Sequence, residues 1–344
     1  MDPKLTLRKL VFSNGLAPFK DTNGKWGYKD INNKIIIPSI YLNVEPFSEQ
    51  LACVSKKNST NTYVKGFIDT SGDTVIPFKE ENFSSRYSFT NGFCRFNNKF
   101  INKKGETPPH LEDFTPITDF CSIGIAIVKF NKQNLLINTN GEIINTKIGF
   151  GNKLIFSDNV FLVKNSSTHS GSYLYYEYVS VKEGFRKIFK HDEYSFERGS
   201  IFSNNCAIVR RKTYFEIINK NGIRKVKLPE YWSHFSYDSP SNDMILLSNF
   251  AEKKENYFNL NKGEYLFEEH LSSSNRYNSF QDGMALVSDH TGKDVGYYNL
   301  DGDLEIKRIY TYGNDFNEGV AAVILGDRYI YIDKKGDKIF SFKF

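Results

Sequence analysis

Apolar and polar residues alternate in a phrase that recurs along the whole chain. An aromatic residue comes first, then two polar residues, then a turn residue that is usually Gly or Asn, and then a short apolar run. The phrase reads FSNGLAPF from Phe12, FSEQLACV from Phe47 and FNEGVAAV from Phe316. Further copies begin at Phe89, Phe156, Phe202 and Phe280, and weaker ones at Phe120 and Pro240. Successive copies start 31 to 46 residues apart, and a period in this range indicates a repeat architecture.

A second phrase follows each first one: an aromatic or aliphatic run ends in Asp or Asn, and Gly follows three residues later. Examples are GFIDTSG, which contains Asp69, and YIDKKG, which contains Asp333. The Asp or Asn side chain caps its own backbone and Gly adopts the left-handed conformation, so the phrase predicts a tight hairpin. Another apolar run comes after the Gly, ending at Pro38 in one copy and at Pro77 in the next.

Each unit is therefore predicted to hold three antiparallel strands, and about nine units fill the chain. A unit of this size cannot bury its apolar face alone, so neighbours must stack. We expect one all-β domain over residues 1–344, forming a curved or closed array, with a large propeller-like ring as the alternative. Residues 4–11 are predicted to form an extra strand, which either completes the last unit or caps an open array.

Composition supports strands and argues against a dedicated nucleic-acid binder. Aromatic residues make up 15% of the chain, nearly all of them Phe and Tyr, which suit half-buried pleated surfaces. The 45 Lys and Arg residues against 40 Asp and Glu residues give a net charge of only +5. A strong positive asymmetry, as expected for proteins that bind nucleic acids directly, is missing.

The four cysteines lie far apart without metal-binding spacing, and Cys53, Cys94 and Cys206 fall in apolar runs, where we expect buried thiols. The first residues lack the apolar stretch of a signal peptide, and no run of 18 apolar residues could cross a membrane. These features predict a cytoplasmic protein without a membrane segment.

The segments GKWGYKD from Gly24 and GFIDTSGDTVIP from Gly66, together with the aromatic phrases, resemble the bacterial WG-repeat family. The resemblance is best over residues 12–87 and 280–340, while residues 89–270 keep the rhythm and lose most of the letters. The Trp-Gly pair occurs once, at Trp26 and Gly27, and Trp232 lies outside that slot. The resemblance implies a modular β-repeat protein whose family has no common set of catalytic residues.

A search for catalytic chemistry finds no nucleophile elbow, phosphate-binding loop or zinc-protease motif, and no two His residues lie two to four positions apart. Asp and Asn exchange freely at the hairpin turns, which turn capping tolerates and acid–base catalysis does not. We therefore predict no enzymatic activity, no catalytic residue, no metal and no cofactor.

Binding is the predicted role. The candidate interface residues are Tyr173, Tyr175, Tyr176 and Tyr178 and the basic run Arg210, Arg211 and Lys212. Exposed tyrosine rings are large and carry a polar tip, which makes them frequent interface anchors. Insertions after Val54 and Val163 fall at the same place in their units, so both are expected to project from one side. We predict a non-enzymatic protein–protein interaction module, an accessory subunit or scaffold of a bacterial complex. The alternative is a nucleic-acid-associated accessory protein that uses a basic and aromatic surface. The sequence is also compatible with a homo-oligomer.

Overall fold

The computed structural model describes residues 3–80, 87–144 and 242–344 in full. Between residues 156 and 235 it describes the backbone of the strands, with side chains at 207–209, 216–219 and 232. The contacts divide the chain into two compact units. Unit 1 holds residues 1–145 and 309–344, and unit 2 holds residues 146–308. The predicted single domain over residues 1–344 stays a prediction.

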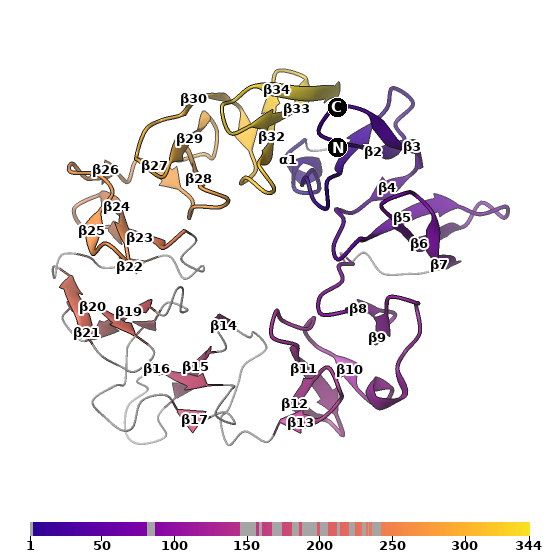
Figure 1. Cartoon of the computed structure of the whole chain (residues 1–344), viewed down its shortest axis with the longest axis horizontal. Helices are drawn as coiled ribbons and strands as arrows, with labels where there is room; N and C mark the ends of the chain where they lie inside the picture. The colour runs from indigo at the N-terminus through magenta and orange to yellow at the C-terminus, as the bar shows by residue number, and fades with distance from the viewer. Residues whose placement is uncertain are drawn as a thin grey trace. The chain divides into compact units, whose positions relative to one another are not determined.

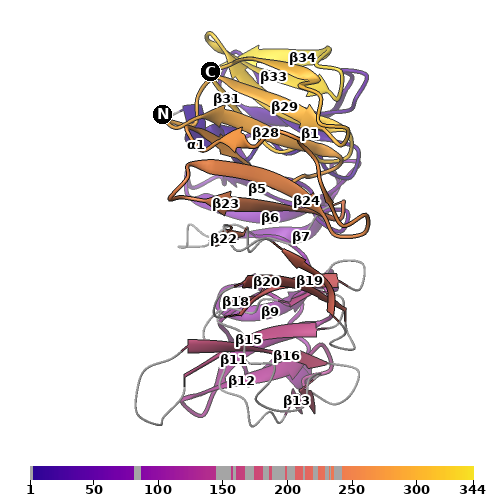
Figure 2. The same cartoon turned by 90° about the vertical axis from the view of Figure 1, so that its left-hand side faces the viewer.

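Unit 1 is built from small antiparallel sheets that follow one another along the chain (Figure 1). Its strands are β1 (Ala17–Lys20), β2 (Trp26–Lys29) and β3 (Ile35–Tyr41); β4 (Asn43–Val44), β5 (Leu51–Lys57), β6 (Tyr63–Asp69) and β7 (Thr74–Glu80); β8 (Phe93–Phe96) and β9 (Lys99–Asn102); β10 (Thr115–Pro116), β11 (Ile125–Phe130), β12 (Gln133–Asn138) and β13 (Ile143–Ile144); and β31 (Tyr312–Gly313), β32 (Val320–Leu325), β33 (Arg328–Asp333) and β34 (Lys338–Lys343). Each group of this series is one sheet, and Figure 2 shows β33 and β34 side by side near the C-terminus.

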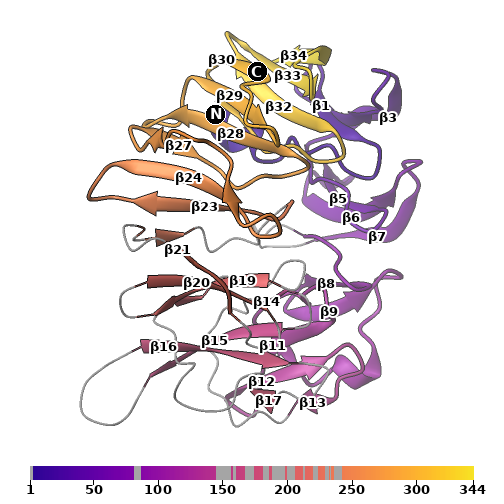
Figure 3. The ribbon, with the colours of Figure 1, turned by 60° about the vertical axis from the view of Figure 1, so that its left-hand side comes forward.

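Unit 2 repeats the pattern. Its sheets are β14 (Phe156–Ser157), β15 (Val160–Ser166), β16 (Leu174–Ser180) and β17 (Arg186–Lys187); β18 (Arg198–Gly199), β19 (Cys206–Arg211), β20 (Tyr214–Asn219) and β21 (Arg224–Leu228); β22 (His234–Phe235), β23 (Met244–Asn249), β24 (Lys254–Asn259), β25 (Glu264–Tyr265) and β26 (Leu271–Ser272); and β27 (Asn275–Tyr277), β28 (Met284–Asp289), β29 (Val295–Asn299) and β30 (Ile306–Tyr310). The long central pair β23 and β24 is clear in Figure 3.

The predicted all-β repeat fold is confirmed, and such small stacked antiparallel sheets resemble the blades of β-propellers. The number of repeats stays a prediction. The three-strand unit needs correction, because most sheets begin with a fourth strand of two or three residues, such as β4, which lies beside β5. A strand this short shows no alternation of its own in the sequence.

The N-terminal segment also differs from its prediction. Residues 4–11 were expected to form a strand, but residues Pro3–Leu7 form the short helix α1. Thr6, Leu7 and Leu10 are all buried, a spacing that suits helical turns better than alternation. The last sheet is completed by its own C-terminal strands β31 to β34, without an N-terminal strand.

Two kinds of turn explain the repeated letters. In the aromatic phrase, Asn14 and Gly15 both adopt positive φ (50° and 77°), while Ser13 and Leu16 exchange backbone hydrogen bonds. This is the geometry of a two-residue hairpin. In the second phrase, the carboxylate of Asp69 accepts hydrogen bonds from the N–H groups of Ser71 and Asp73 (2.9 and 3.0 Å). The predicted turn role of Asp69 is therefore confirmed.

The glycine of the Trp-Gly pair has a steric role. At Gly27 the edge strand β3 bulges toward β2, and a Cβ atom would lie 2.5 Å from the carbonyl oxygen of Ile37. In the equivalent position of unit 2, Asn256 is fully buried, and its amide bonds both the carbonyl and the N–H of Phe267 (2.8 and 3.2 Å). The Asn side chain thus supplies hydrogen bonds to a chain segment that passes over this point.

The sheet β4 to β7 is buried on both faces by its neighbours in unit 1. In the sheet β4 to β7, Val54 and Ile68 pack toward the first sheet, whereas Cys53 and Phe67 pack with residues of β8 and β9. Cys53 and Cys94 are buried free thiols, as predicted, and the side chain of Cys206 lies outside the described residues.

The two ends of the chain meet inside unit 1 (Figure 1). The Tyr331 hydroxyl donates to the carbonyl of Pro18 (2.8 Å), and the Glu318 carboxylate accepts from the N–H groups of Asn14 and Gly15 (2.9 and 3.0 Å). The next turn repeats this link, because the N–H of Gln50 donates to the Asn14 side chain (2.9 Å). The last sheet therefore neighbours the first as the first neighbours the second.

Candidate functional site

The predicted interface residues lie on two different sheets of unit 2. Tyr175, Tyr176 and Tyr178 occupy β16, opposite Asn165, Lys164 and Leu162 of β15, and Arg210 and Arg211 end β19, opposite Phe215 and Tyr214 of β20. Tyr173 and Lys212 lie outside the described residues, and the other five are described by backbone alone. All seven stay predictions.

Basic and aromatic side chains lie on both faces of the β5–β6 hairpin, which the insertion after Val54 lengthens. The Lys56 ammonium lies 3.9 Å from the ring centre of Phe78, and the Lys57 ammonium lies 5.4 Å from that of Tyr63. Tyr63 is 62% exposed. Lys79 of β7 lies opposite Lys65 of β6 in the strand register. We call Lys56, Lys57, Tyr63, Phe78 and Lys79 the hairpin surface.

The hairpin surface is held in place by its turn and by its own stacking. Asn58 caps the turn by accepting hydrogen bonds from the N–H groups of Thr60 and Thr62 (3.0 and 2.9 Å). Each exposed ammonium–ring contact contributes about 0.5–1 kcal/mol and restrains a lysine that would otherwise sample many rotamers. The insertion after Val163 is described only as far as Ser166, so the predicted common side of the two insertions stays a prediction.

The last strands of the first two sheets of unit 1 expose apolar side chains. Ile35 and Ile40 of β3 are 53% and 59% exposed, and Val75 of β7 is 39% exposed. Both strands carry a proline, Pro38 and Pro77, which removes a backbone donor from the free edge. Proline at an edge disfavours addition of a further strand. These edges therefore offer side chains, rather than a backbone ladder, to another molecule.

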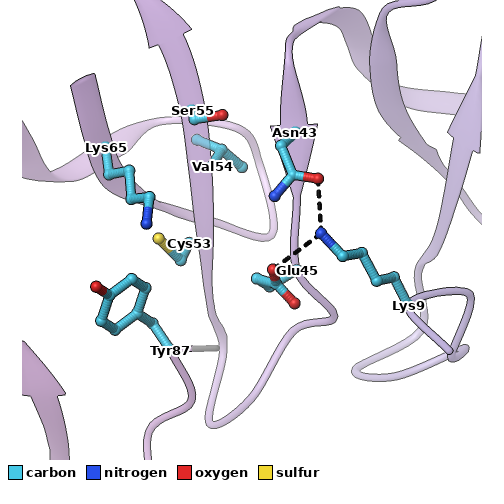
Figure 4. A pocket seen from close by; sticks show the side chains of 8 residues that line it. All are labelled: Lys9, Asn43, Glu45, Cys53, Val54, Ser55, Lys65 and Tyr87. Carbon is cyan, nitrogen blue, oxygen red and sulfur yellow. Dashed lines mark hydrogen bonds and ion pairs between the residues drawn. The ribbon is translucent and has the colours of Figure 1, made fainter. Parts of the chain in front are cut away.

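A polar cleft of about 160 Å³ lies between the turn after α1, the sheet β4 to β7 and the segment before β8 (Figure 4). It is lined by Lys9, Asn43, Glu45, Cys53, Val54, Ser55, Lys65 and Tyr87. The Lys9 ammonium donates to the Asn43 carboxamide oxygen (2.9 Å) and pairs with the Glu45 carboxylate (3.4 Å). On the other side of the cleft, the Lys65 ammonium lies 4.7 Å from the ring centre of Tyr87.

No pattern in the sequence predicts this cleft. Lys9, Glu45, Lys65 and Tyr87 come from four separate segments, and no motif links them. One signal existed, since Lys65 stands in the slot that holds Trp26 in the best copy of the repeat. The repeat itself does not require a lysine at this position, because the best copy holds an aromatic residue there.

The titratable groups of the described residues do not assemble into a catalytic set. No group of three or more His, Cys, Asp and Glu side chains in that part of the chain could hold a metal ion. Burial raises the pKa of the Cys94 thiol well above its usual value, which disfavours the reactive thiolate. Burial also raises the pKa of Glu255 to about 7, and only the Ser248 hydroxyl bonds its carboxylate there (3.2 Å). Within the described residues no helix is long and apolar enough to cross a membrane.

A sequence model of one family, described as WG containing repeat, matches the chain at residues 26–59, 66–99 and 296–329. Each match includes one of the glycines, Gly27, Gly66 and Gly296, at which the neighbouring strand comes too close for a Cβ atom. The chain therefore contains WG repeats at these three places. A search of the curated proteins finds none that matches the WG-repeat chain.

Solved structures match the WG-repeat chain at low identity. The crystal structure of the eukaryotic initiation factor is 12% identical, with a TM-score of 0.51, and the match covers 97% of this chain and 86% of that chain. AztD from Citrobacter koseri is 12% identical, with a TM-score of 0.37, over 83% of this chain and 89% of that chain. Hsv2 from Kluyveromyces lactis is 9% identical, with a TM-score of 0.33, over 55% of this chain and 63% of that chain. The chain thus spans less than two thirds of the Hsv2 structure.

At these identities the likeness concerns the fold alone, and of the three structures only the initiation factor reaches a TM-score above 0.5. WG repeats on small blade-like sheets are typical of scaffolds that bind other proteins.

Proposed function

We propose that this WG-repeat chain is a non-enzymatic interaction scaffold that binds a protein partner through the hairpin surface. The observation that carries the proposal is the stacking of two lysines on aromatic rings at the β5–β6 hairpin, Lys56 on Phe78 and Lys57 on Tyr63. Aromatic side chains with a polar or charged rim are the usual anchors of protein interfaces. A role as an accessory subunit of a bacterial, cytoplasmic complex belongs to the same proposal.

The chemistry of the hairpin surface favours a partner that presents acidic and apolar side chains to the two faces of the hairpin. Lys56, Lys57 and Lys79 carry three positive charges, and Glu80 at the end of β7 supplies one neighbouring negative charge. The rings of Phe78 and Tyr63 offer apolar contacts, one on each face of the hairpin. Restrained cations of this kind speed association with an acidic partner and fix its orientation.

The same geometry argues against the nucleic-acid alternative at this surface. Bases bind single-strand proteins by stacking on open aromatic faces. Lysine ammonium groups lie over the rings of Phe78 and Tyr63, so one face of each ring is occupied. A protein partner is therefore the better match, and a nucleic acid is one outcome of the test below.

Photo-crosslinking tests the proposal. Benzoylphenylalanine replaces Tyr63 in the full chain, and the crosslinked products from cells of the source organism are identified by mass spectrometry. Leu325, which is 42% exposed in the same unit, gives the matched control position. We expect one protein to crosslink at position 63 and not at position 325. Equal labelling at both positions, or products that contain only nucleic acid, would contradict the proposal.

The identified partner is then purified and its affinity measured. The double variant Lys56→Glu, Lys57→Glu should weaken binding by about tenfold or more and flatten its salt dependence. Lys334→Glu, Lys335→Glu, a charge reversal of the same size in the turn before β34, serves as the control and should leave the affinity unchanged. An equal loss in both variants would point to net charge rather than to the hairpin surface.

A further inference from the structure

The edge strand β3 of the first sheet exposes two isoleucines. Ile35 is 53% exposed and Ile40 is 59% exposed, whereas Ile37 and Tyr41 of the same strand are buried in the core of unit 1. A single exposed apolar side chain is common on protein surfaces and needs no explanation. Whether the fold itself requires these two isoleucines follows from the equivalent positions in the other sheets of unit 1.

The repeat does not require an apolar residue at position 35. Ile35 lies opposite Lys29 in the register of β2 and β3. At the same step of the register, the second sheet carries Thr74 and the last sheet carries Lys338. Both of these residues are exposed. A polar residue therefore serves at this place in two sheets of the same unit, and Ile35 is a feature of the first sheet rather than of the fold.

Ile40 belongs to a bulge that is longer than the repeat requires. β3 advances four residues, from Ile37 to Tyr41, while its partner β2 advances two. At the same place β34 advances two residues, from Phe340 to Phe342, while β33 also advances two. The edge strand of the first sheet thus holds two additional residues in the stretch that contains Ile40. Bulges of this kind turn side chains outward at the edges of sheets.

The strands around these isoleucines carry the net positive charge of the chain. Residues 17–41, with β1 to β3, contain four lysines and two aspartates, and residues 328–344, with β33 and β34, contain five lysines or arginines and two aspartates. Their joint excess of five equals the net charge of +5 of the whole chain, so the remaining residues are balanced. The carboxylates of Asp21 and Asp30 accept hydrogen bonds from the N–H groups of their own turns. The electrostatic field at this edge is therefore positive.

Two exposed lysines accompany the isoleucines. Lys34 precedes Ile35 in the chain, and Lys338 holds the equivalent position on the edge strand of the neighbouring last sheet. The nearby Lys343, by contrast, is paired with Asp327 (3.3 Å). We call the following residues the edge surface: Lys34, Ile35, Ile40 and Lys338.

We propose that the edge surface binds an acidic amphipathic segment of another protein, whose apolar side chains contact Ile35 and Ile40 and whose carboxylates face the lysines. Pro38 removes a backbone donor from this edge, so the segment makes contact through side chains rather than as an added strand. A second copy docked through the same edge would bring like charge and be repelled, and a nucleic acid would leave the apolar pair unused. The edge surface shares no residue with the hairpin surface, so this proposal is separate from the proposed function.

Photo-crosslinking at the edge surface is the first test. Benzoylphenylalanine replaces Ile40 in the full chain and, in a parallel sample, Ile143, which is 46% exposed on the edge strand β13 and follows the acidic Glu142. We expect a protein to crosslink at position 40 and not at position 143, through a peptide in which Asp and Glu outnumber Lys and Arg. The proposal is wrong if position 40 gives no product, if both positions label equally, or if the product is a second copy, a nucleic acid or a peptide without an acidic excess.

Binding of the crosslinked peptide, synthesised with a fluorescent label, is then measured by anisotropy with the full chain. Ile35→Thr introduces the residue type that the second sheet carries at this position, so we expect the variant to fold. The double variant Ile35→Thr, Ile40→Ser should weaken binding by about tenfold or more, and Lys34→Glu, Lys338→Glu should weaken it and reduce its salt dependence. Ile143→Thr is the control and should change the affinity by less than about twofold. Edge variants that bind as tightly as this control would overturn the proposal.

Crosslinking at Tyr63 reports on the proposed function separately. If position 63 gives its product while position 40 gives none, only the binding role of the edge surface is refuted. If position 40 crosslinks and position 63 does not, only the role of the hairpin surface is refuted.

Discussion

Glu255 should make the stability of unit 2 depend on pH, and Glu255→Gln should remove that dependence. The residue lies on β24, opposite Ser248 of β23, and is only 9% exposed. One carboxylate oxygen accepts from the Ser248 hydroxyl (3.2 Å), whereas the other is buried without a partner among the described residues. Burial disfavours the charged form, so the pKa of Glu255 is raised from 4.5 to about 7.

The sign of the effect follows from where the proton is held. Between pH 4.5 and 7 the folded chain keeps the proton on Glu255 while the unfolded chain releases it. The free energy of unfolding therefore falls as the pH rises through this window, and the loss is complete above pH 7. At about 1.4 kcal/mol per pH unit the loss amounts to roughly 3 kcal/mol.

Glu255→Gln is neutral at every pH and should show no such fall. The amide N–H of the glutamine is buried without a partner, like the carboxylate oxygen that it replaces. This lowers the free energy of unfolding by about 1–3 kcal/mol, and the loss does not change with pH. The stability of the variant relative to the unmodified chain should therefore rise by roughly 3 kcal/mol between pH 5 and pH 8.

Urea unfolding at pH 5, 6, 7 and 8 measures the difference. The chain has two tryptophans, and Trp26→Phe leaves Trp232, which is 2% exposed and packs against Leu247 of β23, as a reporter on unit 2. Glu252→Gln, at a carboxylate paired with Lys254 on the surface, is the control and should show little pH dependence. If Glu255→Gln differs from the unmodified chain by the same amount at pH 5 and pH 8, the carboxylate is solvated and the reasoning fails.

Three further predictions concern the repeat. Gly27→Ala should cost about 1–3 kcal/mol in thermal or urea unfolding, because the new Cβ would meet the Ile37 carbonyl at 2.5 Å; an unchanged midpoint would mean that the bulge of β3 relaxes freely. Tyr331→Phe should cost about 1–2 kcal/mol and increase hydrogen exchange at the chain ends, because the buried Pro18 carbonyl loses its donor; exchange that does not change would show that this link does not hold the ends together. Asp333→Asn should keep the unfolding free energy within about 0.5 kcal/mol while Asp333→Ala loses about 1 kcal/mol, since either oxygen can cap the turn; equal losses in both variants would show that the charge, not the cap, matters.

The turns of this protein could be predicted because their hydrogen bonds are local. Asp69 and its partners Ser71 and Asp73 lie within four residues, so side-chain chemistry and spacing suffice to identify the turn. The left-handed pair Asn14 and Gly15 is likewise marked by residue types that tolerate positive φ. The alternation of apolar residues then fixes which strands lie between these turns.

The strand β4 and the helix α1 could not be predicted in the same way. Two residues, Asn43 and Val44, are too few to show a period, and they form a strand only because β5 lies beside them. Residues 4–11 contain apolar residues at spacings that fit either a strand or a helical turn. Burial of Leu7 and Leu10 against the last and first sheets decides for the helix.

The sequence by itself determined the period, the hairpin turns and the need for stacked sheets, because each depends on residues close together in the chain. Only the tertiary structure placed the last sheet beside the first, where Tyr331 meets Pro18 across 313 positions of sequence. It also brought Lys9, Glu45 and Lys65 to one cleft. Contacts over such separations leave no periodic pattern in the sequence, since they depend on how the sheets stack and not on the residues next to each partner.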